Sequence, residues 1–240
     1  MATQPIAFAR RFPLGVLSDD GTAAYIGDEI PHIVALDLQS GHVLWRAAVS
    51  GRPIAASAQQ VVVARQALNL ALELDILSAV DGKHLSTRTI APAFPAWADA
   101  NFRPQERFAY RCSLAGANLD IEWRATQHYE GGAPPSQKVV ETNRRTDSGV
   151  LHIDLVSGHS QCEARAIDFH AGKAEPLAVL ASPAREICMH GQFMYYLVDE
   201  PIDANSGRTT LRAVQRGSEE TMWEYAVRTW KASRPRALRP

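Results

Sequence analysis

The side chains most able to do chemistry are scattered along this 240-residue chain. His159 and Cys162 lie three positions apart, as metal ligands often do, but a zinc site needs two further ligands that the sequence does not supply nearby. Asp19-Asp20-Gly21 lacks the alternating oxygen ligands of a calcium loop and is typical of a hairpin turn. The sequence therefore predicts no metal site.

Motifs for hydrolysis, phosphate binding and dinucleotide binding are missing. The sequence has no GxSxG nucleophile elbow, no P-loop, no GxGxxG and no HExxH. Its three cysteines, Cys112, Cys162 and Cys188, are far apart, and no CxxC pair exists. We therefore assign no catalytic, cofactor-binding or metal-binding residue, expect no cofactor, and favour a protein that is not an enzyme.

Charge and hydropathy limit the partners and the compartment. The net charge of −1 gives the whole molecule no strong attraction to nucleic acid or to an anionic membrane. No apolar run is long enough for a transmembrane helix, and residues 1–13 contain no apolar signal region. Unpaired cysteines fit a reducing compartment. We expect a cytoplasmic protein that binds neither nucleic acid nor membranes.

Strand signals dominate the chain, because short apolar or alternating runs are separated by Gly, Asp, Asn and Pro. We expect strands over Ala23–Gly27, Ile33–Leu38 and Val43–Val49. The middle strand is apolar on both faces, which indicates that it is covered on both sides. The best helical candidate, Gln66–Leu77, fits a strand, a loop and a second strand equally well.

The motif A-L-D-x-x-S-G-x-x-x-W, from Ala35 to Trp45, resembles the repeat signature of PQQ-type β-propellers. That family includes quinoprotein dehydrogenases and an outer-membrane assembly lipoprotein. The resemblance implies that Asp37 and Gly41 shape the turn between two outer strands and that Trp45 packs between blades. An Asp side chain can bond a turn backbone and Gly tolerates positive φ, so the physical chemistry agrees. The adjacent cysteine pair of the dehydrogenases is absent.

Weaker copies of the motif follow. The copy at 77–86 keeps Gly82, the copy at 153–162 keeps Asp154 and Gly158, and Trp223 lies on an expected outer strand near the end. Gly41 and Gly82 are 41 residues apart, which is a blade period.

The sequence thus predicts an all-β, β-propeller-like fold, an architecture shared with WD40 proteins. We expect about four four-stranded blades in one domain over 1–230, with a basic tail at 231–240. The blades are expected at about 13–50, 52–91, 106–169 and 183–228. A competing assignment takes 166–173 as a blade turn and could raise the count to five.

Three features bear on recognition of a partner. Aromatic side chains near the expected loops are either interface anchors or inter-blade packing residues, namely Phe94, Trp97, Phe102, Trp223, Tyr225 and Trp230. Glu130–Ser148 is expected to form a long polar loop inside the third blade that is dispensable for folding. The run from Arg228 to Pro240 carries five basic and no acidic residues, and forms either a solvated tail or a docking arm. The residues named for partner contact are Tyr129, Glu130, Gly131, Gly132, Arg144, Arg145 and Trp230.

These features favour a non-enzymatic binding or scaffold module for protein–protein interaction or assembly. The alternatives are a sensor or enzyme that holds a small ligand in the propeller channel, and a structural subunit of a larger assembly. PQQ-type propellers usually have seven or eight blades. The chain is therefore expected to leave an apolar blade face open at each end and to self-associate, for instance as a dimer that completes a ring of eight, or to dock on another subunit. A self-closed small propeller is the competing expectation.

Overall fold

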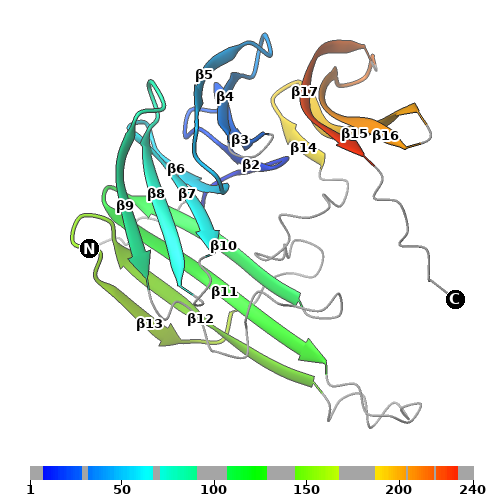
Figure 1. The fold of residues 1–240 in the computed structure, drawn as a ribbon. Coiled ribbons are helices and arrows are strands. Elements are labelled where there is room, and N and C mark those ends of the chain that lie inside the picture. The colour runs from blue at the N-terminus through cyan, green and yellow to red at the C-terminus, as the bar shows by residue number, and fades with distance from the viewer. Residues whose placement is uncertain are drawn as a thin grey trace, which may run out of the picture. The chain divides into compact units, whose positions relative to one another are not determined.

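Four antiparallel sheets make up the described part of this chain (Figure 1). The structure, a computed structural model, describes residues 8–28, 32–66, 71–90, 107–128, 144–167, 187–203, 205–218 and 220–231. The regular elements in these ranges are all strands. The predicted all-β, propeller-like class with four blade-like sheets is confirmed.

Each sheet is an up-and-down meander in which every strand pairs with its neighbours in sequence. The first contains β1 Arg11–Phe12, β2 Gly15–Leu17, β3 Ala23–Gly27, β4 Ile33–Asp37 and β5 Val43–Ala47. The second contains β6 Arg52–Ala56, β7 Gln60–Gln66, β8 Leu72–Ser78 and β9 His84–Ile90. The third contains β10 Arg107–Ala115, β11 Asn118–His128, β12 Arg144–Asp154 and β13 Ser160–Ala164. The fourth contains β14 Ile187–His190, β15 Phe193–Asp203, β16 Ser206–Gln215 and β17 Thr221–Lys231.

Several expected boundaries are wrong. The first sheet has a fifth, two-residue strand, and the helical alternative fails at Leu72–Leu77, which lies in β8. The loop expected over Glu130–Ser148 ends earlier, because β12 begins at Arg144 and pairs with β11 as far as His128. The basic run also begins inside β17, whose last residue is Lys231. Most of the turn in the competing five-blade assignment, from residue 168 on, lies outside the described residues.

The sheets divide between two compact units. One unit comprises Met1–Arg10 and Ile54–Ser182, and so holds the second sheet from Ile54 on together with the third. The other comprises Arg11–Pro53 and Pro183–Pro240, and so holds the first and the fourth sheets. The single domain expected over 1–230 stays a prediction.

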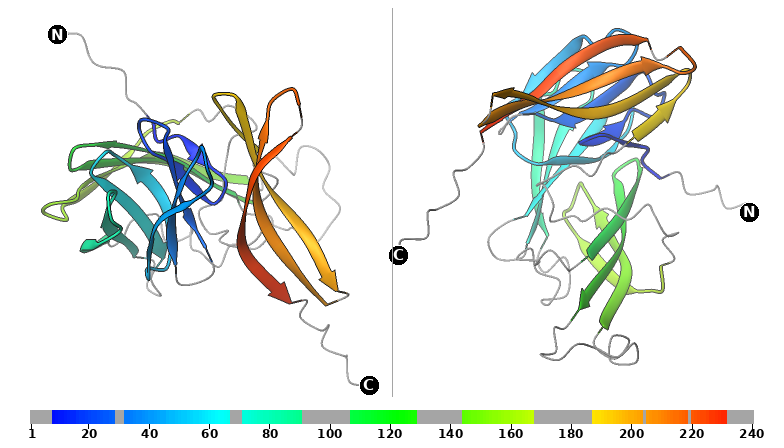
Figure 2. Two further views of the ribbon diagram at one scale, coloured as in Figure 1. Left: turned by 90° about the horizontal axis from the view of Figure 1, so that it is seen from above. Right: turned by 90° about the vertical axis from the view of Figure 1, so that its right-hand side faces the viewer.

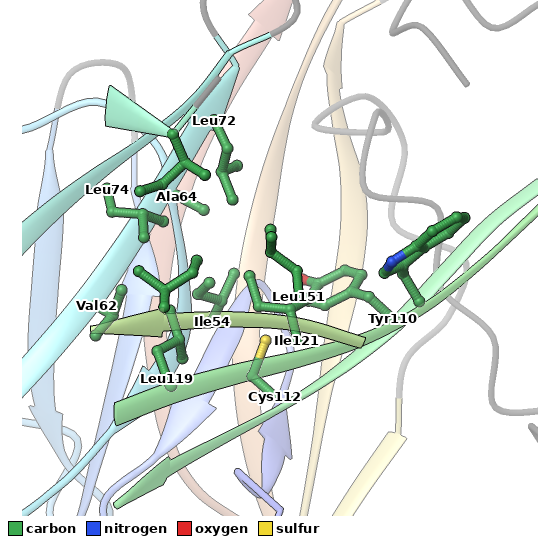
Figure 3. Close-up of a cluster of buried hydrophobic side chains, with 14 of the residues drawn as sticks. Ile54, Val62, Ala64, Leu72, Leu74, Tyr110, Cys112, Leu119, Ile121 and Leu151 are labelled. Atoms are coloured by element: carbon green, nitrogen blue, oxygen red, sulfur yellow. The ribbon is translucent and has the colours of Figure 1, made fainter. Parts of the chain in front are cut away.

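In the unit of the second and third sheets, the core is built from both sheets (Figure 3). In this core, Ile121, Trp123 and Ala125 of β11 are all buried. A second tie between the sheets is polar. Arg88 Nε of β9 donates to the Leu155 carbonyl at 2.8 Å, in the turn that follows β12. The carbonyl of the next residue, Val156, accepts a hydrogen bond from Arg88 Nη2 at 2.9 Å.

The first and last sheets of the chain share the core of the other unit. Ala24 and Val34 of the first sheet belong to the same buried cluster as Leu211 and Val227 of the fourth. Hydrogen bonds from the fourth sheet fix this packing at one carbonyl. The indole Nε1 of Trp223 and the hydroxyl of Tyr195 both donate to the Leu38 carbonyl, at 3.0 and 3.2 Å. The expectation of an open apolar face at each end of the chain is therefore wrong for these two faces, because they cover each other.

A buried carboxylate, paired with a half-exposed arginine and a tyrosine, adds to this packing. The Asp28 carboxylate accepts from the Tyr225 hydroxyl and from Arg46 Nη1, both at 2.7 Å. Burial first, and then the hydrogen bond to Asp28, raises the pKa of Tyr225 well above its usual value. Tyr225 therefore stays protonated throughout the physiological pH range, and its hydroxyl donates a hydrogen bond to Asp28.

Aromatic rows identify the first and fourth sheets as equivalent repeats. In the ladders, Tyr25 lies opposite Ala35, which lies opposite Trp45. The fourth sheet repeats this order as Tyr195, Ala213 and Trp223. The small alanine lets the flanking rings meet, with centroids 5.7 Å apart in the first sheet and 5.8 Å apart in the fourth. The corresponding rows of the other sheets are Val62–Ile76–Ser86 and Ile121–Leu151–Cys162.

The turn before each outer strand also repeats. The N–H of Gly41 donates to the Asp37 carbonyl at 2.9 Å, and Gly41 has a φ of 72°. Gly82 and Gly158 make the same bond, to Ser78 and Asp154, with φ of 71° and 76°. All four sheets share a second bond that closes the turn: Asp37 N to His42 O, Ser78 N to Lys83 O, Asp154 N to His159 O, and Gln215 N to Glu220 O.

Side-chain bonds inside these turns predict a pH dependence of stability. The hydroxyls of Ser40 and Ser157 hold the pKa of Asp37 and of Asp154 below the usual value. Because the folded pKa is the lower one, the stabilisation is complete above a pH of about 4 and is lost as the pH falls through the folded pKa. We expect Asp37→Asn to lower the melting temperature at neutral pH, and its difference from the wild type to shrink toward a pH of about 3. Thermal melts across this pH range measure it, and a difference independent of pH would contradict it.

Candidate functional site

One cluster resembles a catalytic triad in composition but not in geometry. His84 Nε2 lies 2.9 Å from Thr87 Oγ1 and 3.3 Å from Asp75 Oδ1, so both partners meet the same ring nitrogen. The Thr87 hydroxyl itself donates to Asp75. A triad needs the carboxylate on one nitrogen and the nucleophile on the other. This arrangement therefore does not activate Thr87.

A second cluster lies on one face of the third sheet. His152 Nδ1 is 2.7 Å from Asp120 Oδ1, and its Nε2 is 3.7 Å from Glu163 Oε2. The second nitrogen therefore faces a carboxylate rather than a hydroxyl or thiol. Among the described residues, no group of three or more His, Cys, Asp or Glu side chains could hold a metal ion. The same residues include no helix long and apolar enough to cross a membrane.

The residues that the sequence named for partner contact are only partly described. Tyr129, Glu130, Gly131 and Gly132 lie outside the described residues. The backbones of Arg144 and Arg145 lie in β12, opposite His128 and Gln127, and not in a loop. These assignments stay predictions.

Trp230 lies in β17 and is half-buried, opposite Gly207 of β16. A side chain at Gly207 would meet the indole, because a Cβ built there lies 2.1 Å from the Trp230 ring. The ring thus packs on its own sheet. Its role in partner contact stays a prediction.

The start of β12 sharpens the expectation for the 130–148 segment. Replacing 130–143 by a short Gly-Ser linker should leave the melting temperature nearly unchanged, because added or removed loop length costs little. Replacing 130–148 instead also removes Arg144–Ser148, which pair with β11. We expect the longer replacement to lower the melting temperature clearly. Equal melting temperatures for the two replacements would contradict the β11–β12 ladder in this region.

Apolar side chains are exposed on one face of the fourth sheet. On the face opposite the core, the ladders align Ile187 with Tyr196, and Met189 with Met194. Ile187 is 58% exposed and Met189 is 64% exposed. We call this surface the Met–Tyr face and define it by Ile187, Met189, Met194, Tyr196, Val198, Glu200, Arg208, Thr210, Arg212, Val214 and Glu224. Two of these side chains, Thr210 and Val214, are buried within the face. Figure 2 shows the long strands of this sheet from two further sides.

A network of paired charges borders the apolar residues. Arg212 Nε donates to Glu224 Oε1 at 2.6 Å, and Arg212 Nη2 donates to Glu200 Oε1 at 3.0 Å. Arg208 Nη2 donates to the other oxygen of Glu200, also at 3.0 Å. The hydrogen bond from Arg208 holds the pKa of Glu200 below its usual value. The two carboxylates and two guanidinium groups therefore balance one another at neutral pH.

The sequence pattern did not predict this face. The β14–β15 hairpin carries apolar residues on both of its faces. Cys188 and Tyr195 face the core, whereas Ile187 and Met194 lie on the other face. Such a pattern is typical of a strand covered on both sides. One signal in the sequence is the presence of two methionines, Met189 and Met194, in a single short apolar segment.

Comparison with known proteins gives no family. No protein-family model matches the chain, and no curated protein matches its sequence. Among solved structures, the chain is similar to BamB from Moraxella catarrhalis, with 13% identity and a TM-score of 0.27 over 87% of this chain. The chain spans 62% of the length of that BamB chain. At this identity and score the likeness supports no conclusion about function, and the fold class rests on the ladders described above.

Proposed function

We propose that this chain is a non-enzymatic scaffold of the PQQ-type propeller kind that binds a protein through the Met–Tyr face. The observation that carries the proposal is the exposure of Ile187 and Met189 on a sheet whose other face already packs on the first sheet. A sheet face directed to water normally carries polar side chains. Contiguous exposed apolar side chains on a sheet therefore favour an interaction surface.

The chemistry of the face suits a protein partner. Methionine side chains are flexible and polarizable, so Met189 and Met194 can adapt to the shape of another surface. Tyr196 offers an apolar ring with a polar end, as is frequent at interfaces. The paired charges lie beside the apolar residues, and an apolar centre with a polar rim is the usual anatomy of an interface.

We also propose a cytoplasmic location. Cys112, Cys162 and Cys188 are free thiols, and disulfides are rare in reducing compartments. Fractionation of the host cell tests this, and recovery of the protein outside the cytoplasm would contradict it.

A photo-cross-linking amino acid at Met189 tests the binding surface. In extracts of the native host we expect a discrete adduct from position 189. The matched control is position 80, because Val80 is 80% exposed but lies in the β8–β9 turn. The captured protein, once purified, should bind the Ile187→Asp variant at least about fivefold more weakly than the wild type, since a central contact is worth more than about 1 kcal/mol. Equal labelling at both positions, or equal binding by the variant, would contradict the proposal.

A further inference from the structure

The Met–Tyr face carries both signs of charge in equal number. Arg208 and Arg212 are balanced by Glu200 and Glu224, and all four belong to one connected network of ion pairs. A strongly acidic or strongly basic partner gains no net attraction from such a surface. A surface that is itself neutral and mixed in sign is a suitable partner, because no like charges dominate the encounter.

The two most exposed apolar side chains of the face lie on a strand that carries none of these charges. Ile187 and Met189 come from β14 at one edge of the sheet, whereas the charges lie on β15, β16 and β17. A two-fold axis through the apolar part would bring apolar side chains of two copies together and leave the charged groups at the rim. This is the isologous arrangement that most dimers adopt. The charged groups of one copy would then lie near those of the other, where arginine can meet glutamate.

We propose that the partner of the Met–Tyr face is a second copy of this chain, packed face to face about a two-fold axis. The proposal rests on the proposed function, since it names the partner of the same surface. It does not need an incomplete ring, because the terminal sheets already cover each other. The apolar contact supplies the association, and the balanced charges remove the repulsion that identical surfaces would otherwise feel.

Sedimentation equilibrium of the full chain at low micromolar concentration is the first test. We expect a dimer of the 26.3 kDa chain. Met189→Asp places a charge in the apolar contact and should raise the dimer dissociation constant by on the order of 100-fold. The matched control Val80→Asp should leave it unchanged. Circular dichroism and thermal melts establish that both variants are folded.

Charge reversal provides the second test, in two complementary variants. Glu200→Lys with Glu224→Lys makes the face strongly basic, and Arg208→Glu with Arg212→Glu makes it strongly acidic. At an ionic strength of about 0.1 M, where charges act over about 10 Å, each variant alone should be monomeric. An equimolar mixture of the two should form a one-to-one heterodimer. This recovery requires folded chains, so it separates lost association from lost structure.

A wild-type chain that stays monomeric in the first test overturns the proposal, as does a dimer that survives Met189→Asp. Failure of the mixture to associate while each variant is folded also overturns it. These outcomes test the dimer and do not by themselves decide the proposed function. If the wild type is monomeric but position 189 still captures a different protein, the scaffold role stands and the second copy is wrong. If position 189 captures nothing, both proposals fail.

Discussion

Replacing Trp45 by alanine is expected to lower the free energy of unfolding by about 3–5 kcal/mol, as is usual for a buried tryptophan. The Trp45 side chain is 8% exposed, and its ring stacks on Tyr25 with centroids 5.7 Å apart. The strands β3, β4 and β5 have only five residues each, so few other contacts can compensate for the cavity. Urea denaturation followed by circular dichroism measures the change.

Leu44 provides the matched control for Trp45. It precedes Trp45 in β5, lies at the β-bulge between the Leu36–Val43 and Ala35–Trp45 pairs, and is 56% exposed. Leu44→Ala should change the free energy of unfolding by no more than about 0.5 kcal/mol. Equal losses in the two variants would show that the buried and exposed residues of β5 are assigned wrongly.

Gly41 is the second position where a small change is expected to have a large effect. A Cβ at Gly41 would lie 2.6 Å from the indole of Trp223, which itself donates to the Leu38 carbonyl. The φ of 72° adds a cost of about 1–2 kcal/mol for any L-residue with a side chain. We expect Gly41→Ala to lose about 3 kcal/mol in total, near the upper end for single substitutions, because the indole and its hydrogen bond must shift.

The contribution of Trp223 can be separated from the backbone cost. Gly217 also has positive φ, 89°, in the β16–β17 turn, but nothing lies within 4 Å of its built Cβ. Gly217→Ala should therefore lose only the backbone part, about 1–2 kcal/mol. In a double-mutant cycle, Trp223→Leu should reduce the cost of Gly41→Ala. The same cost at both glycines would mean that Trp223 does not pack on the turn in solution.

The parts of the fold that depend on local chemistry could be predicted from the sequence. Asp37 and Gly41 form the expected turn because the serine hydroxyl, the carboxylate and the positive φ are all local requirements. The degenerate copy at Asp154 and Gly158 forms the same turn for the same reason. Strand order followed from turns of this kind, since short connections join antiparallel neighbours.

Features that depend on distant partners could not be predicted. The start of β12 at Arg144 is set by pairing with β11, which the polar composition of the segment does not reveal. Apolar character at Ile187 and Met189 looks the same whether the face is buried or exposed. The packing of the first sheet on the fourth could not be predicted from the sequence either. A repeat motif indicates how many blades a chain contains, but it does not indicate which blade faces pack on each other.

The pairing of the first and last sheets has a consequence for biosynthesis. The apolar face of the first sheet is covered by residues up to Val227 of β17, although its own last strand ends at Ala47. A ribosome adds about 5–20 residues per second, so the remaining roughly 180 residues take on the order of 10–40 s. During that interval the apolar face of the first sheet is uncovered in the nascent chain. We therefore expect folding of the chain to depend on chaperones, and we expect prematurely terminated chains to aggregate.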